Sequence, residues 1–208
     1  MTWVLSIACL VLVGVLLYFE TRNPRERRYP KLAASLAFVA VGIAAGALDS
    51  TFGRIMLIGL ILSLVGDFCL ALDGRAPFVT GLVAFLAAHL AYVWAFAVRG
   101  LGDDLYLPLL GVAAAGVAMA TWLLPTVPRE LRAPVIAYIT AISAMVAFAV
   151  STSTLDTDWR IPSGAVAFYL SDITVARDRF AAPAFANRIV GLPLYYGGQL
   201  LLAWAAGG

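Results

Sequence analysis

Long apolar runs separated by short polar breaks make up most of the chain. A helix that crosses a bilayer needs roughly 20 mostly apolar residues, with about 17 as a lower limit. Applied to the apolar runs, that length predicts eight spans, at residues 2–19, 32–48, 54–72, 78–98, 105–124, 133–150, 162–177 and 187–206. The breaks hold turn-forming and charged residues, such as Asp73-Gly74 and Gly102-Asp103. Because no break could hold a soluble domain, we expect a single integral membrane domain over residues 1–208, an all-α bundle of eight transmembrane helices.

Composition supports a membrane protein. Of the 208 residues, 62% are hydrophobic and 12% are charged, whereas about 25% are charged in an ordinary soluble domain. The formal net charge of +2 is small, so nucleic acid is not an implied partner. Lys31 is the only lysine among fourteen cationic residues. This preference for arginine indicates a GC-rich bacterial source, and therefore a multi-pass protein of the bacterial inner membrane.

The cationic residues are distributed unequally between the two sides of the predicted bundle. An even number of spans puts both termini on one side. The first, third, fifth and seventh loops hold eleven cationic residues, which are Arg22, Arg25, Arg27, Arg28, Lys31, Arg75, Arg129, Arg132, Arg177, Arg179 and Arg188. The opposite side holds only Arg54, Arg99 and Arg160. Because cytoplasmic loops are rich in Lys and Arg, this split predicts that both termini lie outside.

Two carboxylates, Asp67 and Asp172, lie inside predicted spans. A charged carboxylate at a helix centre costs about 2.5 to 3.5 kcal/mol on insertion scales, so such a residue normally faces the bundle interior. Each lies five residues before the cytoplasmic end of its predicted span, and both should therefore lie at one depth. They also occupy the third helix of each four-span half, which suggests an old duplication with parallel repeats.

The helices that follow these two spans carry polar and aromatic stripes. In the fourth span, side chains at three- and four-residue intervals share one face, namely Phe85, His89, Tyr92 and Phe96. In the eighth span, Tyr195 and Gln199 are four residues apart, and Gly197 and Gly198 between them allow close helix approach. Each carboxylate-bearing helix is thus followed by a helix that could wall a cavity.

Simpler interpretations of these residues stay open. A lone histidine such as His89 is often a buried, hydrogen-bonded core residue, and Gln199 can serve only to bridge helices. Ser63 and Ser171 can hydrogen-bond their own helix backbone. The two aspartates can form a structural polar network. Their high cost in lipid nevertheless favours function over structure.

The sequence also excludes several kinds of chemistry. One histidine and two separated cysteines do not supply a typical zinc site. The chain has no Gly-x-Ser-x-Gly nucleophile elbow and no phosphate-binding P-loop. Carboxylate acid and base chemistry, without a metal or another cofactor, is what remains.

Four segments, taken together, resemble the YhhN family of membrane lysoplasmalogenases. They are SLVGD at 63–67, GLVAFLAAHLAY at 81–92, YLSD at 169–172 and YYGGQ at 195–199. Their order and spacing resemble that family across roughly residues 54–204. The family's usual Lys-Pro after the first helix is replaced by Pro30-Lys31, and the alanine of its Ala-Gln motif is Gly198. Both aspartate positions are intact.

The resemblance implies an eight-helix enzyme that cleaves the vinyl ether of a lysoplasmalogen, a lysophospholipid. The products are a fatty aldehyde and glycerophosphoethanolamine or glycerophosphocholine. It implies Asp67 and Asp172 as the catalytic pair. The other substrate contacts that it implies are Ser63, His89, Tyr92, Tyr169, Ser171, Tyr195 and Gln199.

The chemistry of the two aspartates suits that reaction. Vinyl ether hydrolysis begins with proton transfer to the alkenyl carbon, and water then attacks the resulting oxocarbenium ion. One carboxyl kept protonated by burial and repulsion supplies the acid, and an ionised partner stabilises the cation. Glycosidases divide two carboxylates in a similar way. The sequence leaves open which aspartate is the acid.

The substrate phosphate is expected near the cytoplasmic edge, at Arg177, Arg179 or Arg188, or near Arg75. The positive-inside rule alone also explains these arginines. Two rival functions stay open. Paired carboxylates and a parallel repeat are equally expected of a proton-coupled transporter or carrier of a small lipid or amphiphile, and a non-catalytic lipid-binding or scaffold protein is a third possibility. The head group, the chain length and the oligomeric state are not predicted.

Overall fold

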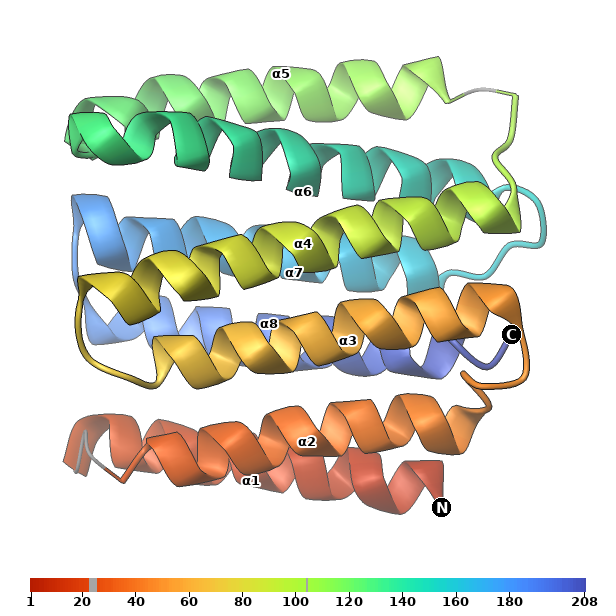
Figure 1. Cartoon of the computed structure of the whole chain (residues 1–208), viewed down its shortest axis with the longest axis horizontal. Helices are drawn as coiled ribbons and strands as arrows, with labels where there is room; N and C mark the ends of the chain where they lie inside the picture. Colours follow the sequence, from red (N-terminus) through yellow and green to blue (C-terminus); the bar gives the residue numbers. More distant parts are fainter. Residues whose placement is uncertain (23–25, 104) are drawn as a thin grey trace.

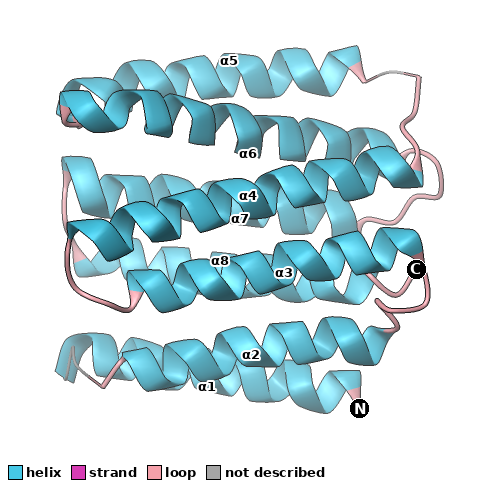
Figure 2. Cartoon of the chain, viewed as in Figure 1, coloured by secondary structure: helices cyan, strands magenta, loops and turns pink. Residues whose placement is uncertain are grey.

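The computed structural model describes residues 1–22, 26–103 and 105–208, and within them the chain forms eight long α-helices joined by short loops (Figures 1 and 2). The helices are α1 (Thr2–Arg22), α2 (Arg28–Ala45), α3 (Thr51–Leu70), α4 (Arg75–Arg99), α5 (Tyr106–Leu123), α6 (Arg132–Ser153), α7 (Arg160–Ala176) and α8 (Phe185–Ala205). The all-α fold is confirmed, and each predicted span corresponds to one helix. Arg25 of the predicted cationic loops lies outside the described residues.

Six helices, α1 to α6, are long and apolar enough to cross a membrane. The eight predicted spans are therefore supported in part. Helix α7 has 17 residues and continues into a π-helical turn, η3 (Arg177–Ala181). Helix α8 carries Asn187, Arg188 and Gln199, which lower its hydropathy. Both helices nevertheless run alongside the others within the bundle (Figure 1).

The helices alternate in direction, so the two termini lie at the same end of the bundle (Figure 1). The loops that follow α1, α3, α5 and α7 lie together at the other end, which carries the larger group of arginines and is called the Arg-rich end below. Asp67 is three residues before the end of α3, and Asp172 is four residues before the end of α7. Both aspartates therefore lie near the Arg-rich end.

The outside of the bundle is apolar. On α3 the exposed large side chains recur at three- and four-residue intervals, at Ile58, Ile61, Val65 and Phe68. On α4 they include Val83, Leu90 and Trp94. Continuous apolar stripes of this kind are unfavourable in water and suit contact with lipid chains.

Glycines bring neighbouring helices into close contact around the site. A Cβ added at Gly66 of α3 would lie 2.6 Å from the ring of Phe85 on α4. Between α7 and α8, a Cβ at Gly198 would lie 2.8 Å from the carbonyl oxygen of Gly164. The two backbones therefore touch directly, as small residues allow in membrane bundles. The neighbouring Gly197 has no atom within 4 Å of its Cβ position.

These two adjacent glycines provide a matched test of the α7–α8 contact. Gly198→Ala should lower the stability by about 1–3 kcal/mol, because backbone atoms must move apart to admit the methyl group. Gly197→Ala should leave the stability unchanged or raise it by up to about 1 kcal/mol, because alanine favours the helix. Thermal unfolding of the detergent-purified proteins measures both. Equal stability of the two variants would contradict the close backbone contact between α7 and α8 at Gly198.

Candidate active site

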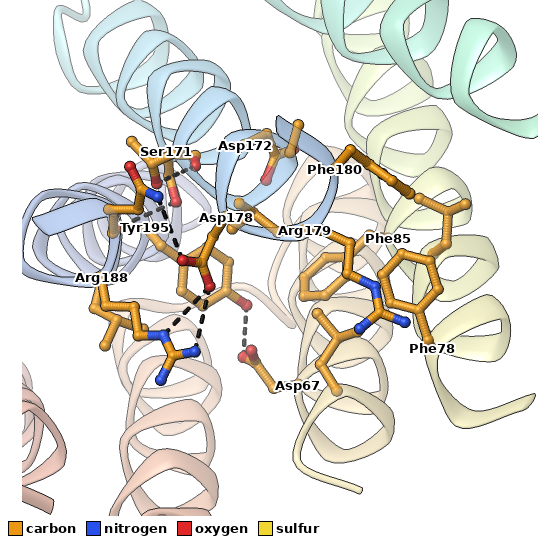
Figure 3. Close-up of a pocket in the computed structure, with 18 of the residues that line it drawn as sticks. Asp67, Phe78, Phe85, Ser171, Asp172, Asp178, Arg179, Phe180, Arg188 and Tyr195 are labelled. Atoms are coloured by element: carbon orange, nitrogen blue, oxygen red, sulfur yellow. Dashed lines mark hydrogen bonds and ion pairs between the residues drawn. The ribbon is translucent and has the colours of Figure 1, made fainter. Parts of the chain in front are cut away.

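A cavity of about 480 Å³ lies at the Arg-rich end of the bundle (Figure 3). All eight helices contribute to its wall, through Glu20, Lys31, Asp67, Phe85, Met119, Tyr138, Asp172 and Tyr195 among others. One part of the wall is apolar and comes from α5 and α6, where Met119, Leu123 and Ile139 line the cavity. The part formed by the ends of α1, α2 and α8 is charged. The cavity therefore has the two-sided character that an amphiphile requires.

Asp67 lies on the cavity wall with only 2% of its surface exposed, among several hydrogen-bond donors. Its Oδ2 accepts a hydrogen bond from the Tyr195 hydroxyl at 2.6 Å and lies 2.7 Å from Oγ of Ser35. Its Oδ1 is 3.2 Å from Nζ of Lys31. The Lys31 carbonyl oxygen also accepts a hydrogen bond from Tyr196 at 3.0 Å. This carboxylate thus joins α2, α3 and α8.

Asp172 has a different environment. Its Oδ2 accepts a hydrogen bond from the Tyr138 hydroxyl of α6 at 2.7 Å. Nε2 of His89, on α4, is 3.7 Å from the same oxygen, too far for a hydrogen bond. His89 is fully buried, with its ring centroid 5.0 Å from that of Tyr138 and 4.7 Å from that of Phe168. No described lysine or arginine lies within 4.0 Å of Asp172.

The two carboxylates therefore differ in their partners. An ammonium group and two hydroxyls surround the Asp67 carboxylate and offset the cost of burying it. Asp172 has one phenol and a histidine that makes no hydrogen bond to the described residues. Both aspartates line one cavity (Figure 3), and among the described residues only Asp67 has a lysine or arginine partner.

The charged part of the wall is itself an ion-pair cluster. Oε2 of Glu20 is 3.0 Å from NH1 of Arg27 and 2.6 Å from NH1 of Arg188. Arg188 also contacts Oδ2 of Asp178 at 3.3 Å (Figure 3). Asp178 accepts a further hydrogen bond from Nδ2 of Asn187 at 3.3 Å. The cluster links α1 and the start of α2 to η3 and α8, and its four charges cancel.

The structure brings together some of the predicted site residues and separates others. The cavity is lined by Asp67, Asp172, Tyr169, Ser171, Tyr195, Arg179 and Arg188. The remaining predicted residues do not line it, namely Ser63, Arg75, His89, Tyr92, Gln199 and Arg177. Tyr92 and Gln199 do meet, since the Tyr92 hydroxyl donates to Oε1 of Gln199 at 2.8 Å. They belong to the buried packing behind the cavity, together with His89, which contacts Asp172.

Sequence reasoning missed several residues of the site. Tyr138, Glu20 and Asp178 line the cavity, and Ser35 contacts Asp67. Lys31 was considered as a topological charge and as part of the Pro30-Lys31 departure from the family motif, but not as a site residue. Two features of the sequence could have identified Lys31 as a site residue. It is the single lysine of the chain, and it lies four residues before Ser35, on the same face of α2.

Fold and site together define a multi-pass helical membrane protein with a two-carboxylate cavity. The YhhN family model matches residues 27–206. The chain belongs to the YhhN family.

Curated relatives are similar over much of the chain. Lysoplasmalogenase TMEM86B of Homo sapiens is 37% identical over 147 residues, which cover 71% of this chain and 61% of the relative. TMEM86B of Sus scrofa is 35% identical over 69% of this chain and 59% of the relative. A lysoplasmalogenase of Mycobacterium bovis is 34% identical over 77% of this chain and 63% of the relative. The aligned part thus spans about three fifths of these relatives. No solved structure matches the chain.

The ion-pair cluster generates a prediction for stability. Arg188→Gln should lower the stability by about 1–3 kcal/mol, because it leaves the largely buried carboxylate of Glu20 with fewer partners. Arg177→Gln is the matched control, since Arg177 is exposed and has no ion pair with a described residue. Its effect should stay within about 0.5 kcal/mol. Thermal unfolding in detergent compares the two, and a control variant as unstable as Arg188→Gln would refute the role of the cluster.

Proposed function

We propose that this protein is a lysoplasmalogenase that hydrolyses the vinyl ether of a lysoplasmalogen by two-carboxylate catalysis. The observation that carries the proposal is the pair of aspartates on one cavity, of which only Asp67 is paired with a cation in the part of the chain that the structure describes. Membership of the YhhN family and the names of the relatives support the same reaction. Neither a metal nor a nucleotide takes part.

In the proposed mechanism, Asp172 is the acid and Asp67 is the anion. Lys31 and the surrounding hydroxyls keep Asp67 ionised. No described residue hydrogen-bonds Oδ1 of Asp172, so this oxygen is available to carry a proton into the cavity. Two nearby carboxyls do not both ionise readily in a poorly solvated site, and the one without a cation retains the proton.

The bond changes follow from this assignment. Asp172 transfers its proton to the alkenyl carbon that is not bonded to oxygen, which leaves an oxocarbenium ion at the carbon bonded to oxygen. The Asp67 carboxylate stabilises this cation and orients the attacking water. Water adds to the cationic carbon and returns a proton to the carboxylate pair. The resulting hemiacetal collapses to a fatty aldehyde and the glycerol hydroxyl of the glycerophospho product.

The phosphate is placed at two arginines that make no ion pair with a described carboxylate. Arg28 and Arg179 both line the cavity. The guanidinium of Arg179 lies 4.2 Å above the ring of Phe78, and that of Arg28 lies 5.2 Å from the ring of Tyr29. Arg179 was one of the arginines expected from the sequence, and so was Arg188, but the charge of Arg188 is already engaged by the ion-pair cluster. The alkenyl chain then extends along the apolar wall of α5 and α6.

The proposed topology has eight spans, with the Arg-rich end in the cytoplasm and both termini outside the bacterial inner membrane. The 11 to 3 distribution of cationic residues supports this orientation. The alignment of α7 and α8 with the six apolar helices supports eight spans (Figure 1). A single membrane domain remains our interpretation of the whole chain.

A parallel repeat of α1–α4 and α5–α8 is also proposed, and packing supports it. Helix α2 packs on α8 as α6 packs on α4. Asp67 takes partners from α2 of its own half and α8 of the other, and Asp172 takes Tyr138 from α6 and contacts His89 on α4. The two aspartates therefore occupy corresponding places between the halves.

Loss of either aspartate should abolish turnover. We expect Asp67→Asn and Asp172→Asn each to lower aldehyde release from a lysoplasmalogen by about 10²- to 10⁴-fold, the usual range for a group that transfers protons. Aldehyde is measured with an added aldehyde dehydrogenase, using purified protein in detergent. Detergent maintains no proton gradient, so turnover there also separates hydrolysis from transport. Asp73→Asn, at an exposed loop of the same end, is the control and should be fully active.

The Lys31 ammonium should be needed to keep Asp67 charged. Lys31→Met should lower kcat about 10- to 100-fold, because the carboxylate loses its charge partner, and Lys31→Arg should restore much of the rate. In the double variant Lys31→Met with Asp67→Asn, the loss should be no greater than with Asp67→Asn alone, since both changes act on one interaction. Additive losses in this cycle would show that Lys31 acts elsewhere.

A further inference from the structure

The hydroxyl groups of the cavity wall are nearly all engaged. Five described residues with hydroxyls line the cavity, at Tyr138, Tyr169, Ser171, Thr174 and Tyr195. Tyr138 donates to Asp172 and Tyr195 donates to Asp67. Ser171 donates to the Gly191 carbonyl oxygen and Thr174 donates to the Ser171 carbonyl oxygen. Tyr169 alone makes no hydrogen bond to a described residue.

The isolated hydroxyl of Tyr169 needs an explanation. The residue is only 9% exposed, and its hydroxyl oxygen is buried. A buried hydroxyl without a partner costs about 1–3 kcal/mol, so such groups usually serve a ligand or a water molecule. Tyr169 also lies three residues before Asp172 on α7, which puts both side chains on one helix face.

Its position in the cavity indicates which part of a lipid it meets. The wall is charged at α1, α2 and α8 and apolar at α5 and α6, while Asp67, Tyr169 and Asp172 line it as well. An amphiphile bound with its phosphate at the charged part and its tail at the apolar part places its glycerol near the aspartates. The free glycerol hydroxyl of a lysolipid lies on the carbon next to the one that bears the ether oxygen.

We propose that the Tyr169 hydroxyl binds the free sn-2 hydroxyl of the lysolipid glycerol and so makes the site selective for lysolipids. This inference rests on the proposed function. An acylated glycerol has no free sn-2 hydroxyl to offer to Tyr169. A site built to hydrogen-bond a substrate hydroxyl discriminates strongly against analogues that lack it.

Holding this hydroxyl also has a chemical consequence. The sn-2 oxygen is the nearest nucleophile to the oxocarbenium carbon. If it attacks, a new C–O bond closes a five-membered cyclic acetal, the hydroxyl proton leaves to a carboxylate, and no water is consumed. The product is an isomer of the substrate and releases no aldehyde. A hydrogen bond from Tyr169 keeps this oxygen away from the cation, so that water attacks instead.

The test compares wild type and Tyr169→Phe on two substrates, a lysoplasmalogen and its 2-deoxy analogue, which lacks the sn-2 hydroxyl. With the lysoplasmalogen, the variant should lower kcat/KM for aldehyde release roughly tenfold, the loss expected for one hydrogen bond. With the 2-deoxy analogue, the two proteins should be equally active. The variant should also form cyclic acetal from the lysoplasmalogen, detected by chromatography and mass spectrometry as an isomer that takes up no oxygen from isotopically labelled water.

Two control variants separate this role from others. Tyr138→Phe acts through Asp172 and should impair both substrates equally. Tyr106→Phe, exposed at the start of α5, should impair neither. Tyr169→Phe should not lower the thermal stability, because it removes a hydroxyl that has no partner among the described residues.

The possible outcomes are distinct. Equal impairment of both substrates by Tyr169→Phe, as expected if its hydroxyl positions the attacking water, overturns the inference. An unchanged kcat/KM with no cyclic acetal also overturns it, while leaving the proposed function in place. If wild type releases aldehyde from neither substrate, the proposed function itself is wrong.

Discussion

The carboxylate of Asp67 is the group on which the rest of the site depends. It lies inside an apolar bundle with 2% of its surface exposed, where an unpaired charge would cost several kcal/mol. Lys31, Ser35 and Tyr195 surround it and offset that cost. Because these partners come from α2 and α8, the chain must bring helices from both of its ends against α3. Removing one of these partners therefore leaves the buried Asp67 carboxylate incompletely compensated.

The need to pair buried charges also explains why most of the charged residues on the cavity wall form ion pairs. Lys31 neutralises Asp67, and Arg27 and Arg188 neutralise Glu20 and Asp178. Ion pairs in a poorly solvated wall are stable only when each charge has a partner. The cationic residues that line the cavity without such a carboxylate, Arg28 and Arg179, are then the ones with charge to offer an anionic ligand.

The aspartates and the helices could be predicted from the sequence, whereas the shape of the cavity could not. Asp67 and Asp172 were recognisable because ionisable residues are rare in apolar helices. Lys31 was not recognised because a cation at a helix end is also what the positive-inside rule predicts. His89, Tyr92 and Gln199 were expected in the cavity. A polar and aromatic stripe along one helix face, however, predicts only that this face points into the bundle. Whether it meets packed side chains or a cavity depends on several helices at once.

The proposed parallel repeat of the two halves would have one further consequence. If both halves had identical partners around their aspartates, a lipid could bind across the pseudo-twofold axis in either of two equivalent directions. The cation beside Asp67 and the phenol beside Asp172 remove that equivalence. In the proposed mechanism, the lysolipid therefore binds in one direction, with Asp172 facing the same end of the vinyl ether each time. Different partners at a few positions thus give the two aspartates chemically distinct surroundings within one cavity.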